Sequence, residues 1–173
     1  VEGAGPLDGG ARRGLLLHLL HAFGPDGTPL GTLWAKPWTR EEDATCAPRT
    51  RAQRAATPIE LKESVRWLEA LRQAQKEALR WPATRTILVS DSEADIYEFL
   101  AEAGAQAQGV EWIVRSCQDR ALQSSGVGEM AARVLSEAVQ TRPVLFTQTI
   151  PVRGRRGKVS CEARGRRQPR QSR

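Results

Sequence analysis

The 173-residue sequence predicts an α/β fold, with one mixed sheet covered by flanking helices. Apolar runs rich in branched residues, which are typical of strands, recur along the chain. Segments whose apolar residues are spaced three and four apart, as in helices, separate the later runs. The resulting order is strand, strand, helix, strand, helix, strand, which favours two antiparallel strands early and a crossover later. With 40% apolar residues, the chain can bury one core rather than two full domains.

The N-terminal part predicts a β-hairpin after a glycine-rich lead-in, residues 1–13. Gly14 to Phe23 is nearly continuous in apolar residues, as expected of a central strand. Pro25-Asp26-Gly27 is typical of a turn, because proline fixes φ and glycine accepts a positive φ. Leu30 to Trp38 resumes as a second strand, so the segment predicts an antiparallel pair.

Histidines and cysteines give no sign of a transition-metal site. His18 and His21 lie three apart in a predicted strand, which puts them on opposite faces. Cys46, Cys117 and Cys161 are odd in number and widely spaced, without a CxxC pair. This pattern predicts a reducing, intracellular setting without a disulfide framework or a zinc site.

No segment predicts a membrane span or a signal peptide. The longest apolar run, Leu15 to Phe23, is far too short to cross a bilayer. We therefore expect a protein of the cytoplasm that does not bind a membrane.

The middle of the chain predicts a loop followed by the clearest helix. Residues 39–56 are polar and charged, as in a loop or mobile linker. Thr57-Pro58-Ile59-Glu60 then combines a capping box with proline at the first helical position. The predicted helix ends at Trp81-Pro82. Its apolar stripe contains Leu61, Val65, Leu68, Leu71, Ala78 and Leu79, whereas Lys62, Glu63 and Arg66 lie off the stripe and are interpreted as a solvated face.

A strand over residues 86–90 ends on Asp91, and a helix is expected to follow as far as Ala103. The spacing puts Ala94, Tyr97, Leu100 and Ala101 on the apolar face of that helix. Such a junction holds a carboxylate at the carboxyl edge of a sheet, a common place for a metal-binding acid. A plain helix cap explains Asp91 at least as well, so the spacing leaves both roles open.

The C-terminal part predicts a strand over Val110–Ser116, a short helix over Glu129–Gln140 and a strand over Val144–Val152. The tail from Arg153 to Arg173 holds nine Lys or Arg and one acid, a net charge of +8, which leaves −2 for the rest of the chain. A tail of this kind predicts a polyanionic partner, with nucleic acid ahead of a membrane surface. Solubility or disorder is the competing explanation.

Four segments together resemble the catalytic core of bacterial insertion-sequence transposases of the IS-four type. They are GLLLHLLHAFGPDGTPLGTLWAKPW, PIELKESVRWLEAL, ILVSDSEADIYEFL and EWIVRSCQDR, in this order. The resemblance spans about Gly3 to Val152. It implies a DDE transposase with a ribonuclease-H-like fold, in which three carboxylates bind two Mg²⁺ or Mn²⁺ ions. It also implies DNA transposon ends as the partner and a homodimer in the full synaptic complex.

The resemblance gives several residues a role. Asp91 matches the second acid of the family, which implies a catalytic metal ligand. Arg115 and Arg120 flank Cys117-Gln118-Asp119 and are expected near DNA phosphates, although Arg120 could instead be a surface residue paired with Glu111 or Asp119. The basic tail adds the expected nucleic-acid contacts Arg153, Arg155, Arg156 and Lys158.

The sequence also departs from the family pattern. Asp8 lies in the glycine-rich segment GAGPLDGG, which in the family follows the first acid, so the strand bearing that acid is expected to precede this chain. The family's Tyr-Arg-Glu-Lys signature is absent, because three residues after Tyr97, the chain's one tyrosine, stands Leu100. Ser92 also stands where the family often has arginine. These departures indicate a truncated or frame-disrupted copy.

The predicted organisation is a lead-in over 1–13, a partial ribonuclease-H-like core lacking its first strand over 14–140, the start of a β-rich insertion over 141–152 and a disordered basic tail over 153–173. The predicted function is that of a DDE transposase fragment that is catalytically incomplete as it stands. Two alternatives stay open: a non-enzymatic nucleic-acid-binding protein that uses its basic tail, and an inactive relic.

Overall fold

The computed structural model describes residues 3–7, 12–40, 50–105, 109–122, 134–154 and 157–166, and the chain divides into two compact units. The first unit, Val1–Ser116, contains β1 (Gly5–Pro6), β2 (Arg13–Gly14), β3 (Leu16–Phe23), β4 (Pro29–Trp38), α1 (Arg51–Ala56), the 3-10 turn η1 (Ile59–Leu61), α2 (Val65–Arg80), β5 (Thr86–Ser90), the 3-10 turn η2 (Ser92–Ala94), α3 (Tyr97–Ala105) and β6 (Val110–Val114). The second unit, Cys117–Arg173, contains α4 (Leu135–Gln140), β7 (Val144–Gly154) and β8 (Gly157–Arg166). The fold is mixed α/β, as predicted.

The predicted hairpin is confirmed. β3 and β4 pair antiparallel, from Leu16 opposite Trp38 to Phe23 opposite Pro29. At the turn, the Asp26 carboxylate accepts a hydrogen bond from the Thr28 N–H at 3.0 Å. Gly27 has a φ of +86°, a conformation that side chains other than glycine rarely adopt.

The predicted loop over residues 39–56 is wrong at its C-terminal end, where α1 forms; residues 41–49 lie outside the described residues. Thr50 makes the capping box of α1 with Gln53. Thr57 ends α1, so the capping box predicted at Thr57 does not form. Its segment makes the turn η1 instead, and α2 begins only at Val65.

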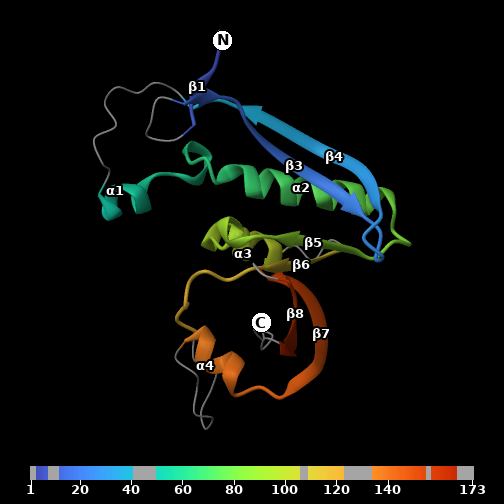
Figure 1. Cartoon of the computed structure of the whole chain (residues 1–173). Helices are drawn as coiled ribbons and strands as arrows, with labels where there is room; N and C mark the ends of the chain where they lie inside the picture. Colours follow the sequence, from blue (N-terminus) through green and yellow to red (C-terminus); the bar gives the residue numbers. More distant parts are fainter. Residues whose placement is uncertain are drawn as a thin grey trace. The chain divides into compact units, whose positions relative to one another are not determined.

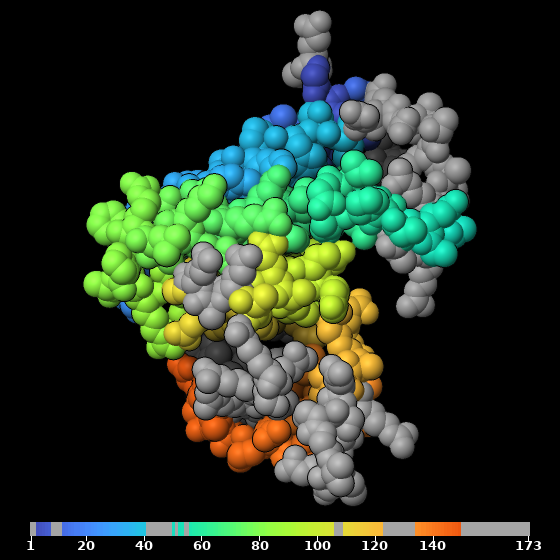
Figure 2. Space-filling model, turned by 180° about the vertical axis from the view of Figure 1, so that it is seen from behind, coloured from blue at the N-terminus to red at the C-terminus, as the bar shows by residue number. Residues whose placement is uncertain are grey.

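Helix α2 contacts β3, β4, β5, β6 and α3 (Figure 1). Its buried residues are Leu68, Ala70, Leu71, Ala74, Gln75 and Ala78. This confirms Leu68, Leu71 and Ala78 of the predicted stripe, whereas Val65 is half-buried and Leu61 and Leu79 are exposed. The core joins α2 to Leu20 of β3, Leu88 of β5, Phe99 of α3 and Val110 of β6. Seen from behind, α2 runs between the hairpin and the α3 region as a green band (Figure 2).

Strands β5 and β6 pair in parallel, with Thr86 opposite Val110 and Ser90 opposite Val114. The strand predictions for these segments are confirmed. The first unit nevertheless has separate two-stranded sheets, β3–β4 and β5–β6, among its described residues, rather than one mixed sheet. A ribonuclease-H-like core requires a continuous sheet and stays a prediction.

The predicted apolar face after Asp91 is confirmed for Ala94, which is buried, and for Leu100, which packs partly buried against the core, but it is wrong for Tyr97 and Ala101. The 3-10 turn η2 precedes α3 and shifts the phase of the side chains that follow it. Tyr97 and Ala101 are therefore exposed, whereas Phe99 and Ala103 are buried.

In the second unit, β7 and β8 form an antiparallel hairpin, with Arg153 opposite Lys158. The sequence predicted disorder from residue 153 onwards, but Gly157–Arg166 forms β8. The predicted helix over 129–140 is present as Leu135–Gln140, while residues 123–133 lie outside the described residues. The two compact units divide after Ser116, and the predicted core over 14–140 stays a prediction. None of the helices described is both long and apolar enough to cross a bilayer.

Candidate functional site

The candidate site lies at the carboxyl end of the β5–β6 pair. Asp91 directly follows the last residue of β5 and is exposed. The N–H of Arg115, which follows β6, donates to the Ser90 carbonyl at 3.1 Å. The backbones that carry Asp91 and Arg115 therefore leave the sheet side by side, at the edge where open α/β sheets bind ligands.

Asp91 is also a cap, as the sequence allowed. It is the N-cap of η2, and its Oδ1 accepts from the Glu93 N–H at 2.8 Å. A carboxylate has two oxygens with lone pairs to spare, so this bond commits only part of its capacity. The cap and a cation ligand are therefore compatible roles for the exposed Asp91.

Asp95 is a second carboxylate at this edge, but it is only 7% exposed. The Ser116 hydroxyl lies 3.5 Å from its Oδ2, the long limit of a hydrogen bond. The Asp95 N–H donates to the Ser92 carbonyl at 3.3 Å and helps to close η2. Asp95 therefore belongs to the packing of the turn against the end of β6.

Glu93 is the remaining acid at this edge, and it forms an ion pair with Arg66 of α2. The Arg66 Nη2 lies 2.5 Å from the Glu93 Oε2, and the Arg66 side chain is only 14% exposed. Its guanidinium lies 4.9 Å from the centre of the Trp38 ring and 5.9 Å from that of Trp67. The spacing along α2 predicted a solvated face for Arg66, and this interpretation is wrong, because that spacing does not reveal the hairpin that covers the side chain.

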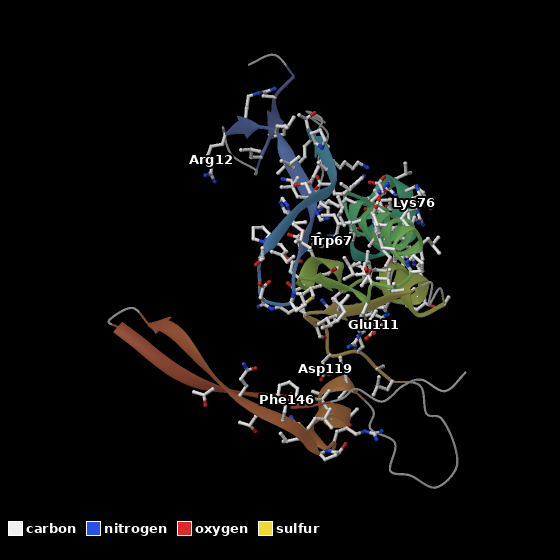
Figure 3. The ribbon with its side chains drawn as sticks, turned by 90° about the vertical axis from the view of Figure 1, so that its right-hand side faces the viewer. Arg12, Trp67, Lys76, Glu111, Asp119 and Phe146 are labelled. Atoms are coloured by element: carbon white, nitrogen blue, oxygen red, sulfur yellow. The ribbon has the colours of Figure 1, made fainter. Side chains whose placement is uncertain are left out.

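His18 brings β3 to the same site. Its ring packs edge-on against Trp67 at 4.4 Å and Trp34 at 5.8 Å, and Trp67 projects from α2 toward the hairpin (Figure 3). Burial lowers the pKa of His18, Arg66 lowers this pKa further, and the carboxylates of Glu93, Asp91 and Glu69 oppose the shift. His18 and Arg66 are thus site residues that sequence reasoning missed, and the adjacent Arg66-Trp67 pair was the one weak signal.

The described residues alone do not fit a divalent metal pair. Within them, no three His, Cys, Asp or Glu side chains group closely enough to hold a metal ion. Of the acids near the end of β5, Glu93 is paired with Arg66 and Asp95 is buried. Mg²⁺ takes six oxygen ligands in near-octahedral geometry, and Asp91 supplies two oxygens at most.

The two predicted DNA-contacting arginines lie in different units. Arg115 is exposed at the end of β6 in the first unit. Arg120 lies in the second, where its carbonyl accepts from the Leu135 N–H at 2.9 Å. Of the acids weighed as partners of Arg120, Glu111 binds Arg85 at 2.7 Å, and Asp119 accepts from the N–H and hydroxyl of Ser136.

The other predicted contacts belong to the β7–β8 hairpin. Arg153 and Lys158 are cross-strand neighbours at its turn end, and Arg155 and Arg156, between them, lie outside the described residues. The backbone therefore brings Arg153 and Lys158 together on neighbouring strands.

Comparison with known proteins identifies no relative: no family model matches the chain, and no curated protein matches it.

Proposed function

We propose that this chain is part of the catalytic core of a DDE DNA transposase, in which Asp91 is one of the carboxylates that hold the divalent ions. The observation that carries the proposal is the exposed carboxylate at the end of β5, beside the end of its parallel neighbour β6. The four motifs that resemble the IS-four type transposases support it, because Asp91 stands at the position of the family's second acid.

In such a site Asp91 would hold part of a pair of divalent ions, which would supply activation of the attacking water or hydroxyl and stabilisation of the leaving oxygen in phosphoryl transfer. The chain's own residues do part of this work. Asp91 offers a ligand, and the η2 cap bond fixes the direction of its carboxylate. Exposed Arg115 contributes positive charge to the neighbouring strand end, where a DNA phosphate would be neutralised. Because the family's Tyr-Arg-Glu-Lys signature is absent from the sequence, we infer that the chain alone is incompetent for DNA cleavage.

Manganese binding tests the role of Asp91. We expect Mn²⁺ to broaden the amide NMR signals of residues 91–93 in the intact chain and to spare them in Asp91→Asn, since asparagine keeps the cap oxygen but loses the charge. Asp26 provides a matched control, because it is an exposed aspartate whose carboxylate accepts from the Thr28 N–H. Equal broadening around Asp26 and Asp91 would reduce Asp91 to a cap and contradict the proposal.

A cleavage assay tests whether the chain is incomplete. We expect no nicking of DNA carrying the transposon end when the purified chain is incubated with it and Mn²⁺. Nicking that disappears in Asp91→Ala would show that the chain holds enough ligands on its own. This result would overturn the claim that the chain is catalytically incomplete, and it would support the transposase chemistry.

The charge of the tail favours a second candidate, a non-enzymatic nucleic-acid-binding protein. The tail holds nine of the 26 Lys and Arg residues. Deleting residues 153–173 would remove β8, so the matched variant changes charge alone, with glutamine at Arg153, Arg155, Arg156 and Lys158. Each phosphate that the protein no longer neutralises makes the negative slope of log affinity against log salt less steep by about 0.9. An unchanged slope in filter binding would eliminate this second function.

A further inference from the structure

A second concave surface lies between β4 and α2, and Asp91 is not part of it. It is an open groove of about 430 Å³, lined on one side by residues 34–37 of β4. On the other side it is lined by Glu69, Arg72, Gln73 and Lys76 of α2. Their spacing of three and four residues places these side chains on one face of the helix. Small-ligand sites measure about 300–1,000 Å³, so the groove is large enough for a small molecule.

Positive charge dominates the lining of this groove. Lys36, Arg72 and Lys76 contribute three cations and Glu69 one anion, so the lining has a net charge of +2. The Lys36 Nζ lies 2.6 Å from the Glu69 Oε2, and these two charges offset each other. The excess positive charge therefore belongs to Arg72 and Lys76, which lie one helical turn apart on α2. Like charges at this spacing destabilise a helix, and an anion bound between them would remove the repulsion.

The two cations differ in how they are held. The Arg72 Nε and Nη2 each donate to the Glu102 carboxylate of α3 at 2.7 Å, which offsets part of the charge of Arg72 and fixes its guanidinium. A guanidinium carries five N–H donors, so this pair leaves the Nη1 donors for a ligand. In the described part of the chain, no acid pairs with Lys76, and its side chain is exposed. The groove thus joins one oriented cation to one that lacks an acidic partner there.

Trp34 is the aromatic residue among those that line the groove. It is half-buried, packs against the core and meets the ring of His18 edge-on at 5.8 Å, so its position is fixed from the core side. Nucleic-acid bases stack favourably on an indole, because every base has a flat π-face. Surfaces that bind a strand repeat aromatic residues for successive bases, whereas a lone tryptophan serves one base.

We propose that the groove between β4 and α2 binds a nucleoside 5′-phosphate, with its base on Trp34 and its phosphate at Arg72 and Lys76. A phosphate monoester carries a charge of about −1.5 to −2 at neutral pH, which suits the excess positive charge of the lining. Gln73 lies on the same face of α2, and its side-chain N–H donates to Glu77 at 3.0 Å. Its amide oxygen can accept from a sugar hydroxyl. The proposal uses neither Asp91 nor a metal, so it does not depend on transposase chemistry.

An NMR titration of the full chain tests the inference, in buffer without divalent ions so that Asp91 plays no part. The probe is adenosine 5′-monophosphate, which should shift the Trp34 indole N–H and the Gln73 side-chain amide signals saturably at millimolar concentration. Inorganic phosphate should bind about tenfold more weakly, because it lacks the stacking base. Adenosine should also bind about tenfold more weakly, because it lacks the charged group. Inorganic phosphate that binds as tightly as the nucleotide would overturn the assignment.

Two variants of exposed α2 cations give the matched comparison. Lys76→Gln removes a charge from the groove and should weaken binding of the nucleotide about tenfold. Arg80→Gln removes a charge from the same helix outside the lining and should leave binding unchanged. Equal weakening in both variants would indicate general charge attraction and overturn the inference, as would a nucleotide that shifts neither reporter signal. A thymidine oligonucleotide that shifts these signals when the mononucleotide does not would assign the groove to a nucleic-acid strand and overturn it too.

Discussion

The variant Arg66→Ala tests whether the Arg66 side chain stabilises the packing of α2 against the hairpin and η2. Its side chain is 14% exposed, packs on two indoles and binds Glu93. Arg66→Ala removes all of these interactions together, while alanine keeps the helix propensity of the position. The expected change in the free energy of unfolding is the sum of their separate contributions.

The largest contribution is packing. Burial of the aliphatic stem against Trp38 and Trp67 is worth about 1 kcal/mol. The cation–π contacts add about 0.5–1 kcal/mol. The ion pair adds less than about 0.5 kcal/mol, because Glu93 is 61% exposed and solvent screens the interaction. Arg66→Ala should therefore lower the free energy of unfolding by about 2 kcal/mol, and Arg66→Met, which keeps most of the stem, by about half of that.

Urea denaturation measures these changes, and Arg80→Ala is the matched control. Arg80 is also on α2 and pairs with Glu77 at 3.1 Å, but its side chain is 67% exposed. Its truncation should change the free energy of unfolding by less than about 0.5 kcal/mol. If Arg66→Ala and Arg80→Ala destabilise the protein equally, the buried contacts of Arg66 do not contribute to stability as argued.

His18 should titrate by NMR below its ordinary pKa of 6.5, chiefly because burial disfavours the charged ring, and Arg66→Met should raise that pKa by removing a nearby cation. Since this depressed pKa means that the unfolded chain binds the proton more readily, the contribution of His18 to stability should fall as the pH drops through 6.5, and His18→Gln should flatten this pH dependence. Leu71 is 1% exposed, so Leu71→Ala should cost about 3 kcal/mol in urea denaturation; the exposed Leu79 gives a control variant, Leu79→Ala, that should cost less than about 0.5 kcal/mol.

Elements whose formation depends on residues close together in the sequence were predicted well. β3, β4, β5 and β6 follow apolar runs, and the Pro25-Asp26-Gly27 turn follows its own backbone chemistry. The start of α2 was missed because Thr57 ends α1 instead of capping a helix, and the segment after it makes the turn η1 before α2 begins at Val65. β8 was missed because the charge of the tail hid an alternation of Val159, Cys161 and Ala163 with polar residues, the period typical of a strand.

The candidate site was only partly predictable. Asp91 could be placed because its position depends on one strand and the turn that follows it. His18 and Arg66 come from β3 and α2, and their approach to Asp91 depends on how the hairpin packs on the helix. Period and spacing report the faces of a single element, and they carry no information on which faces meet.

The charges around Asp91 distinguish it from its two acidic neighbours. Asp95 is buried, and Glu93 is exposed but pairs with Arg66 at 2.5 Å. A cation at Glu93 would therefore have to displace the Arg66 guanidinium, whereas in the described part of the chain the exposed Asp91 carboxylate carries only its cap bond to the Glu93 N–H. Of the three acids, Asp91 is thus the one at which Mn²⁺ should bind first, and broadening centred on Glu93 or Asp95 instead would contradict this assignment.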